Sequence, residues 1–259
     1  AYSSYGVVTA YYLGVFMTMP YKLENYEFTS HRLYTNKPPC GPKRGHGAIQ
    51  PRFALEVHLD RMAAMIGMDP ATVRLKNLIT PGSETVNGLK VTSVGLKECL
   101  QAVIEASDYH KKRGNLPPGH GIGLAASAYM CGALHAVYQN NMPHSGVQLK
   151  VDRCGKVTIF SGTSDVGQGS NHMLALLVAE RLGINPLQCR VIEADTDLTP
   201  VDLGSYSSRV TFMAGNAAIH AADRVRAIIF DAVSEKFDCE ISELKARDGI
   251  ISCGEKTIK

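Results

Sequence analysis

The sequence predicts an α+β protein in which mixed sheets are covered by helices. Apolar residues recur at helical spacing between residues 50 and 106, and again between residues 170 and 237. Short strand patterns stand at 147–160 and 189–194, with glycine or proline between the segments. The 259 residues are 45% hydrophobic and 20% charged, a globular composition that allows one or two domains.

The first part of the chain is expected to form strands and then helices. Aromatic and polar residues alternate over residues 1–35, which predicts strands, and the most apolar run, about Val7 to Met19, is expected to be a buried strand or helix. Three prolines and three glycines between Asn36 and Gly47 exclude regular structure there. Helices are expected at 50–66, from Asp69-Pro70 to a point before Pro81, and at 96–106. Their expected apolar faces are Leu55, Leu59, Met62 and Ile66 in the first helix, and Leu96, Leu100 and Val103 in the third.

A second domain is expected after a polar segment that is rich in glycine and proline. We take 1–106 as the first domain, 107–119 as a linker and 120–259 as the second domain. The second domain should begin with a strand at 121–128 and a hairpin formed by 147–151 and 157–160. A helix from residue 170 to its C-cap at Gly183, a strand at 189–194 and a helix at 211–237 should follow. The long helix is expected to pack through Ala217, Ala218, Ala221, Val225, Ile228 and Ile229, and a short helix and a hairpin should occupy 241–259.

Charge and cysteine content exclude several classes of protein. The net charge is +3 and the basic residues are scattered, apart from the short run Lys111–Arg113, so no nucleic-acid partner is expected. No signal peptide or membrane span is evident, and a cytoplasmic protein is expected. The cysteines, at 40, 99, 131, 154, 189, 239 and 253, include no Cys-x-x-Cys pair, which argues against a zinc or iron–sulfur site and against a disulfide scaffold. We therefore expect reduced cysteines and no metal held by protein side chains.

The most informative motif is the glycine turn 162–169, which contains Gly167-Gln168-Gly169. It stands where the strand at 157–160 ends and the helix beginning at Ser170 starts. Free backbone N–H groups at a helix start form a seat for an anion, typically a cofactor phosphate, and glycine allows close approach. An empty glycine turn explains the motif about equally well, and its spacing fits neither a P-loop nor a dinucleotide fingerprint.

Three segments together resemble the molybdenum-binding large subunit of the xanthine oxidase family of molybdenum hydroxylases. They are the loop Thr35–Gly47, the turn Gly162–Gly169, and the stretch that runs from Asp195-Thr196-Asp197 through Gly204 to Arg209. Within that family, Asn36–Gly47 and Pro200–Arg209 look most like 4-hydroxybenzoyl-CoA reductase and its close relatives. The resemblance covers nearly the whole chain, which would then comprise parts of the two molybdenum-cofactor-binding domains.

The resemblance implies roles for particular residues. Gly167, Gln168, Gly169 and Ser170 would contact the cofactor. Arg44, Gly45 and His46 would border the molybdenum and the substrate, and His46 replaces the phenylalanine that is usual in oxidase and dehydrogenase relatives, which argues against a purine. The small residues that close the pocket would be Ser205, Tyr206, Ser207 and Ser208. Read alone, Arg44 would more often anchor its loop, and Asp195, Asp197 and Asp202 more often form turn hydrogen bonds than a cation site.

The resemblance also implies partners and a reaction class. The cofactor would be a molybdopterin, expected in its cytosine dinucleotide form, with iron–sulfur clusters and possibly FAD on partner domains or subunits. The family's catalytic glutamate should lie beyond residue 259, since Gly254-Glu255 stands in an expected hairpin turn; the chain, which lacks an initiator methionine, would be an inactive fragment by itself. The expected substrate is an aromatic CoA thioester, and the alternatives are an aldehyde or N-heterocycle hydroxylase and a non-catalytic cofactor-domain module.

Overall fold

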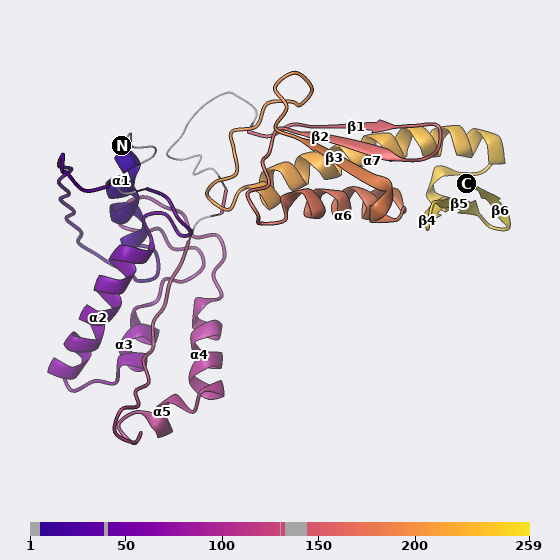
Figure 1. Ribbon diagram of the computed structural model, residues 1–259. Helices are drawn as coiled ribbons and strands as arrows, with labels where there is room; N and C mark the ends of the chain where they lie inside the picture. Colours follow the sequence, from indigo (N-terminus) through magenta and orange to yellow (C-terminus); the bar gives the residue numbers. More distant parts are fainter. Residues whose placement is uncertain (1–5, 39–40, 130, 133–143) are drawn as a thin grey trace. The chain divides into compact units, whose positions relative to one another are not determined.

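A computed structural model describes residues 6–38, 41–129, 131–132 and 144–259, and the chain divides into two compact units (Figure 1). The first unit ends at Tyr129 and the second comprises the rest of the chain. The described elements are helices and two small sheets, so the expected α+β class is confirmed. Residues 1–5 of the expected N-terminal strands, and Pro39 and Cys40 of the expected loop, lie outside the described residues. No helix in the described ranges is both long and apolar enough to cross a membrane.

The first unit is built from helices, several of which begin and end where the sequence predicts. Figure 1 shows α2, α3 and α4 one after another along this unit. Asp69 caps α3 by accepting a hydrogen bond from the backbone N–H of Thr72 at 2.9 Å, and Pro70 occupies the first helical position. The helices are α1 (Gly6–Met17), α2 (Ile49–Met65), α3 (Pro70–Asn77), α4 (Leu96–Ala106) and α5 (Tyr109–Lys112).

The expectation of strands is wrong for residues 6–35, and the helix that was the alternative for Val7–Met19 is the one that forms. Residues 6–17 form α1, and residues 22–38 form no helix or strand. Tyr12 and Phe16 of α1 are buried, and Tyr21 is buried where it forms an isolated bridge to Leu78. The run is rich in β-branched and aromatic residues, which favours strands by local propensity, but a helix that is apolar on every side is stable once it is packed in a core.

The buried face of α2 is polar where the sequence predicts an apolar stripe. Leu55 and Leu59 pack against the core, but Met62 and Ile66 are exposed. Arg52 and Glu56 are buried on this helix instead. In α4 the buried face also differs from the predicted one, because Val103 is half exposed and the next residue, Ile104, is buried beside Leu100.

A buried charge network replaces the missing apolar contacts of α2. Arg74 of α3 is fully buried and donates from Nε to the Glu56 carboxylate at 2.7 Å and from Nη1 to Asp60 at 2.7 Å. The Tyr21 hydroxyl donates to the other Glu56 oxygen at 2.7 Å. Burial, with the adjacent Glu56 carboxylate, raises the pKa of Tyr21, so this hydroxyl keeps its proton. The network therefore joins α2, α3 and the segment after α1.

Residues 107–129 pack into the first unit. Tyr109 of α5, inside the expected linker, is buried in the same core cluster as Leu100 and Ile104. The expected strand at 121–128 is wrong, because these residues join no sheet. They pack as an irregular segment, in which Ile122 and Leu124 contact the core and the backbone N–H of Ala126 donates to Glu56 at 3.0 Å. A backbone N–H that is satisfied by a buried carboxylate needs no neighbouring strand.

The second unit contains a three-stranded mixed sheet and two long helices. Strand β1 (Val147–Val151) pairs antiparallel with β2 (Val157–Ser161), and β2 pairs parallel with β3 (Cys189–Glu193). Helices α6 (Ser170–Leu182) and α7 (Val210–Phe237) pack on each other and against the sheet (Figure 1), and the short helix η1 (Pro186–Gln188) precedes β3. The hairpin, both helices and β3 are confirmed, including Gly183 as the left-handed C-cap of α6.

The core of this unit lies between the sheet and the two helices. Val157 and Ile159 of β2 meet Leu174 and Val178 of α6 there. Along α7 the buried positions are Val210, Ala214, Gly215, Ala218, Ala222, Phe230, Val233 and Phe237. The predicted face of α7 is correct at Ala218, which is buried, and wrong at Ile228, which is 70% exposed. The helix packs on α6 through Ala214, Ala218 and Ala222, which follow one another at one-turn spacing on one face.

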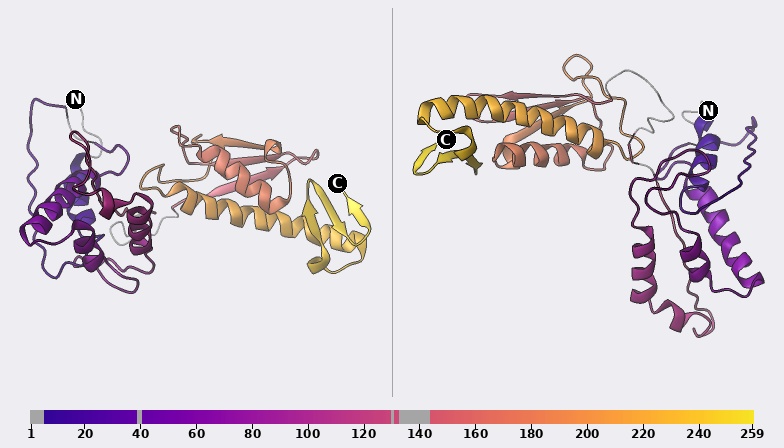
Figure 2. Two further views of the ribbon diagram at one scale, coloured as in Figure 1. Left: turned by 90° about the horizontal axis from the view of Figure 1, so that it is seen from below. Right: turned by 180° about the vertical axis from the view of Figure 1, so that it is seen from behind.

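A second small sheet closes the C-terminal end of the unit. It comprises β4 (Lys245–Arg247), β5 (Ile250–Cys253) and β6 (Lys256–Ile258), after the short helix η2 (Ile241–Glu243). Both views in Figure 2 place this sheet against the end of α7. Phe230, Val233, Phe237 and Leu244 form the cluster between them. The expected hairpin, with Gly254-Glu255 in its turn, is confirmed.

Gly183 provides a test of this packing. Its φ is +68°, and a Cβ there would lie 2.4 Å from the carbonyl oxygen of Ala246 in β4. We expect Gly183→Ala to lower the free energy of unfolding by about 2–5 kcal/mol, through left-handed strain and overpacking together. Urea unfolding of the variant measures this loss. Gly155→Ala is the matched control, because Gly155 has φ +77° but open space around its Cβ position, and it should cost only about 1–2 kcal/mol; equal losses in the two variants would contradict the packing.

Candidate functional site

The glycine turn lies between β2 and α6, as the sequence predicts. Gly167 and Gly169 have φ of +99° and +84°, and the second is the N-cap of α6. A Cβ at either glycine would meet no atom within 4 Å. Backbone conformation therefore explains both glycines, and residues 166–169 are exposed with room for a ligand to approach.

The anion at the start of α6 is supplied by the chain itself. One oxygen of the Asp165 carboxylate accepts hydrogen bonds from the N–H groups of Gly167 at 2.9 Å and Gly169 at 3.2 Å. The other oxygen accepts from the N–H of Asn171 at 3.2 Å. These donors hold the pKa of Asp165 below its usual value. The N–H groups of Gly167, Gly169 and Asn171 are therefore not free for a phosphate, because a carboxylate five residues before the first residue of α6 already accepts from them.

The Gln168 side chain folds back onto its own turn. Its oxygen accepts from the N–H of Val166 at 2.7 Å, and its amide nitrogen donates to the Ser164 carbonyl at 3.1 Å and to Ser170 Oγ at 2.9 Å. Both amide protons are thus used within the turn. Gln168 fixes the shape of the loop, and the surface presented outward is backbone together with the 77% exposed side chain of Val166.

The serine stretch 205–208 lies against the glycine turn. Ser205 Oγ donates to the carbonyl of Ser164 at 2.6 Å and accepts from the N–H of Ser164 at 3.2 Å. Ser207 and Ser208 have φ of +50° and +51°, which is uncommon for residues other than glycine. Two of the three segments singled out in the sequence are therefore brought together by a reciprocal pair of hydrogen bonds.

Arg209 holds the serine stretch in place, a role that the sequence did not assign. Its buried guanidinium donates to Asp202 at 2.8 Å, to the carbonyl of Gly204 at 2.7 Å and to Ser145 Oγ at 2.8 Å. It also donates to the carbonyl of His144 and lies over the ring of Tyr206 at 5.6 Å. The signal in the sequence was an aspartate seven residues before an arginine, across a run of small residues. Asp202 is thereby an ion-pair partner, and Asp195 caps its own turn by accepting from the N–H groups of Asp197 and Leu198.

The Arg44 loop belongs to the first unit and is docked on α1. Arg44 is exposed and has φ of +34°. His46 Nε2 lies 2.7 Å from Thr9 Oγ1, and its ring packs edge-on against Tyr12 with centroids 5.0 Å apart. Burial lowers the pKa of His46, which favours the neutral ring. A Cβ on Gly47 would lie 2.3 Å from Tyr12 Cβ, so the close contact between loop and helix requires glycine there.

The pH dependence of stability tests the role of Asp165. A carboxyl whose folded pKa is depressed stabilises the fold above its unfolded pKa, and this contribution is lost as pH falls through the folded pKa. We expect Asp165→Asn to lower the urea midpoint near neutral pH and to flatten its decline below about pH 4. Urea titrations at several pH values measure both effects. Asp152→Asn is the control for an exposed turn carboxylate that accepts from the N–H groups of Cys154 and Lys156. A decline as steep in Asp165→Asn as in the unchanged chain would contradict the assignment.

Comparison with known proteins identifies both parts of the chain. Residues 1–78 and residues 102–259 match two family models, each described as a molybdopterin cofactor-binding domain. A putative xanthine dehydrogenase molybdenum-binding subunit of Escherichia coli (strain K12) is 33% identical over 231 residues, which is 86% of this chain and 30% of that protein. The gamma subunit of the 6-hydroxypseudooxynicotine dehydrogenase complex of Paenarthrobacter nicotinovorans is 31% identical over 242 residues, 89% of this chain and 30% of that protein.

Solved structures agree with these matches. Quinoline 2-oxidoreductase from Pseudomonas putida 86 superposes with a TM-score of 0.83 at 20% identity, over 96% of this chain and 33% of that one. The aldehyde oxidoreductase from Desulfovibrio desulfuricans ATCC 27774 gives a TM-score of 0.73 at 26% identity, over 87% of this chain and 25% of that one. The chain spans about 30% of the length of the two relatives named above. Its two family matches, together with these relatives, show that it belongs to the molybdopterin cofactor-binding family and corresponds to a part of the molybdopterin-binding large subunit of the molybdenum hydroxylases.

Proposed function

We propose that this chain is part of the catalytic subunit of a molybdenum hydroxylase that oxidises an aldehyde or an N-heterocycle. The observation that carries the proposal is the reciprocal hydrogen bonding of Ser205 with Ser164, which joins the glycine turn to the serine stretch in one surface of the second unit. The relatives support the reaction class, since their names include xanthine dehydrogenase, quinoline oxidoreductase and aldehyde oxidoreductase.

The donors on this surface suit a ring system more than a free phosphate. Asp165 occupies the N–H groups of Gly167, Gly169 and Asn171, and Gln168 is engaged within the turn. The exposed backbone of residues 166–169 and the side chain of Val166 form an open, largely uncharged surface. A flat heterocycle such as a pterin can lie on such a surface with its polar edge toward backbone groups. Gly167, Gln168, Gly169 and Ser170 would then position the cofactor by shape.

The roles of the other site residues are part of the same proposal. Ser205, Tyr206, Ser207 and Ser208 would close the pocket beside the turn, held by Arg209. Arg44, Gly45 and His46 would form the wall of the first unit that borders substrate, with His46 neutral at physiological pH. When bound, the cofactor supplies the two-electron redox chemistry, and these residues bind and orient it and exclude water.

The proposed holoenzyme contains more than this chain. We propose a molybdopterin in its cytosine dinucleotide form, iron–sulfur clusters and possibly FAD on partner domains or subunits, and a catalytic glutamate outside residues 1–259. One relative is named as a subunit of a dehydrogenase complex, which supports a multi-subunit assembly.

Reductive dehydroxylation of an aromatic CoA thioester, which removes a ring hydroxyl, is the second candidate. The amino-acid sequence of the loop 36–47 and of Pro200–Arg209 favours it, as does His46 at the position expected to border substrate. None of the relatives named above is a CoA-thioester reductase, so the comparisons favour the hydroxylase.

The parent complex tests these proposals. It should contain stoichiometric molybdenum and oxidise an aldehyde or an N-heterocycle such as quinoline, with an artificial electron acceptor. Turnover of 4-hydroxybenzoyl-CoA to benzoyl-CoA with a low-potential donor, and no oxidation of the first substrates, would establish the second candidate. Absence of molybdenum from the intact complex would leave a non-catalytic module.

A variant of the turn tests the proposed cofactor contact. Gln168→Ala removes the hydrogen bonds that shape the turn, and we expect it to lower the molybdenum content of the complex. Gln188→Ala is the control, because that side chain also accepts a local backbone hydrogen bond, from Asn185, but lies at η1. Equal molybdenum content in both variants and in the unchanged complex would contradict a role for the turn.

A further inference from the structure

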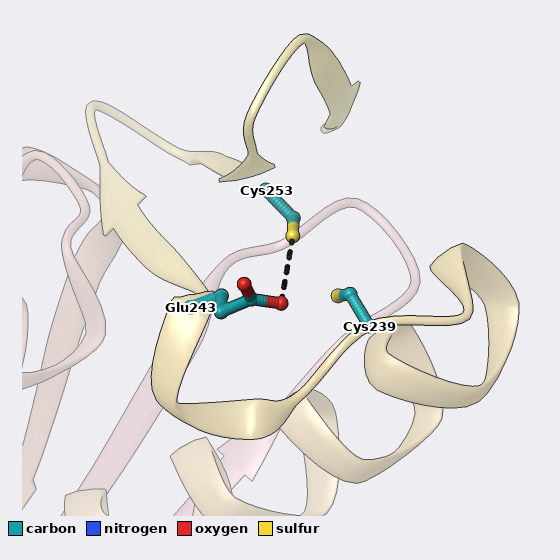
Figure 3. A group of neighbouring side chains, drawn as sticks. All are labelled: Cys239, Glu243 and Cys253. Atoms are coloured by element: carbon teal, nitrogen blue, oxygen red, sulfur yellow. Dashed lines mark hydrogen bonds between the residues drawn. The ribbon is translucent and has the colours of Figure 1, made fainter.

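Three side chains that can ligate a metal meet at the C-terminal end of the second unit. They are Cys239, Glu243 and Cys253, and Figure 3 shows their reactive atoms turned toward one another. One ligand atom from each, two Sγ atoms and a carboxylate oxygen, lies within 4.8 Å of the other two. Cys239 follows α7, Glu243 ends η2, and Cys253 ends β5.

The backbone fixes each of the three positions. The Ser234 hydroxyl donates to the carbonyl of Cys239 at 2.6 Å, which holds Cys239 to the last turn of α7. Glu243 accepts from the N–H of Glu240 at 3.2 Å in a capping box around η2. Cys253 is held in the β5–β6 ladder opposite Lys256. Because these elements share the cluster of Phe230, Val233, Phe237 and Leu244, the ligand atoms are gathered before any ion arrives.

The two thiols and the carboxylate lie close to one another, and Glu243 also accepts the capping hydrogen bond from Glu240. Cys239 and Cys253 are free, half-buried thiols. The contact between Cys253 Sγ and Glu243 Oε2 is 3.9 Å, a weak S–H hydrogen bond. Neither thiol belongs to the glycine turn, the serine stretch or the Arg44 loop.

We propose that Cys239, Glu243 and Cys253 form a zinc site. Two thiolates and one carboxylate are ligands that Zn²⁺ accepts in a tetrahedron, and a water molecule would complete it. Mg²⁺ and Ca²⁺ require oxygen ligands, and Cu⁺ prefers sulfur alone, so the mixed set favours zinc. Binding releases the two thiol protons to solvent and changes no oxidation state.

The charges at the site suit a divalent cation. Two thiolates and a carboxylate carry a formal charge of −3, which a Zn²⁺ ion reduces to −1. Lys256 supplies a nearby positive charge, since its ammonium donates to the carbonyl of Phe237 in the last turn of α7. A bound ion would join the end of α7, η2 and β5 across the small C-terminal sheet, and so stabilise the sheet against the helix.

The test uses the 259-residue chain purified under reducing conditions. We expect one equivalent of zinc by native mass spectrometry, a sulfur-to-metal charge-transfer band when Cd²⁺ replaces zinc, and a higher thermal midpoint with zinc than with a chelator. Cys239→Ser and Cys253→Ser should abolish all three effects. Glu243→Gln should weaken zinc binding while it keeps the capping box, because glutamine also serves at that position.

Two control variants should leave zinc binding unchanged. Cys154→Ser and Glu255→Gln change an exposed thiol and an exposed carboxylate elsewhere in the unit, and they should bind zinc like the unchanged chain. Unfolding midpoints measured in chelator show whether Cys239→Ser and Cys253→Ser fold. If these two variants do not fold, the zinc affinity of Glu243→Gln decides whether the three residues bind zinc. The proposal is overturned if the reduced chain takes up no zinc, if the controls lose zinc equally, or if Cys239 and Cys253 are recovered as a disulfide in the protein as isolated.

Discussion

Replacing Arg74 with methionine is expected to lower the free energy of unfolding of the first unit by about 3–5 kcal/mol. Arg74 is fully buried and pairs with Glu56 and Asp60 at 2.7 Å each. Glu56 is itself buried, and its remaining partners are the Tyr21 hydroxyl, the N–H of Ala126 and, at 3.8 Å, the buried guanidinium of Arg52. The large effect comes from the loss of the shortest charged partner of the buried Glu56, which would keep only the longer contact with Arg52, since methionine fills much of the space that the arginine stem occupies.

The measurement is native-state hydrogen exchange of amides in α2 and α3, supported by urea unfolding. Arg181→Met is the matched control, because Arg181 also pairs with a carboxylate at 2.7 Å, that of Asp223, but both side chains are more than one third exposed. Exposed pairs contribute about 0–1 kcal/mol. The double variant Arg74→Met with Glu56→Gln should recover part of the loss, and a single variant no less stable than Arg181→Met would show that the network is not what holds the unit together.

Replacing Arg209 with methionine is expected to cost the second unit about 3–5 kcal/mol and to release the serine stretch from the glycine turn. Arg209 and Asp202 both have fully buried side chains, 2.8 Å apart. The same guanidinium satisfies the carbonyl of Gly204 and the hydroxyl of Ser145. Its loss takes the charged partner from the buried Asp202 carboxylate, which would keep only the Gly204 N–H and the Ser145 hydroxyl as donors, and this is costlier than the loss of an exposed charge.

Two readouts separate the structural effect from the proposed role in cofactor binding. Urea unfolding of Arg209→Met reports the loss of stability, with Arg190→Met as the control for an exposed arginine on β3. Hydrogen exchange at Ser164, whose N–H donates to Ser205 Oγ, reports whether the two segments separate. Unchanged exchange at Ser164 would show that Ser205 holds the turn without help from Arg209.

The secondary structure was predictable where local signals agree. Asp69-Pro70, Gly169 and Gly183 mark the ends of helices by cap and turn chemistry that acts within a few residues. The β1–β2 hairpin follows from strict alternation around a tight turn. Local signals left the run of α1 open between strand and helix, because its aromatic and β-branched residues favour strands locally, and the burial of Tyr12, Val15 and Phe16 in the core stabilises the helix.

The candidate site was predictable as a set of segments but not as a set of contacts. The glycine turn was recognised as a strand-to-helix junction, yet the Asp165 carboxylate that fills it acts through side-chain geometry, which residue type alone does not reveal. Arg209 was read only as the end of a motif, although it is the buried donor that organises the stretch before it. The cofactor contacts proposed for the turn and the serine stretch, and the substrate contacts proposed for the Arg44 loop, stay predictions.

The sequence by itself determined the α+β class, most helix and strand positions in the second unit, and the segments that mark a molybdenum hydroxylase, because periodicity, caps and motifs are local properties of the chain. The tertiary structure alone decided which polar groups meet. It buried Arg74 with Glu56 and brought Cys239, Glu243 and Cys253 together without any Cys-x-x-Cys spacing. The physical reason is that charge pairing and metal ligation depend on distances of a few ångströms between residues that are remote in sequence, and only the packing of the helices and sheets sets those distances.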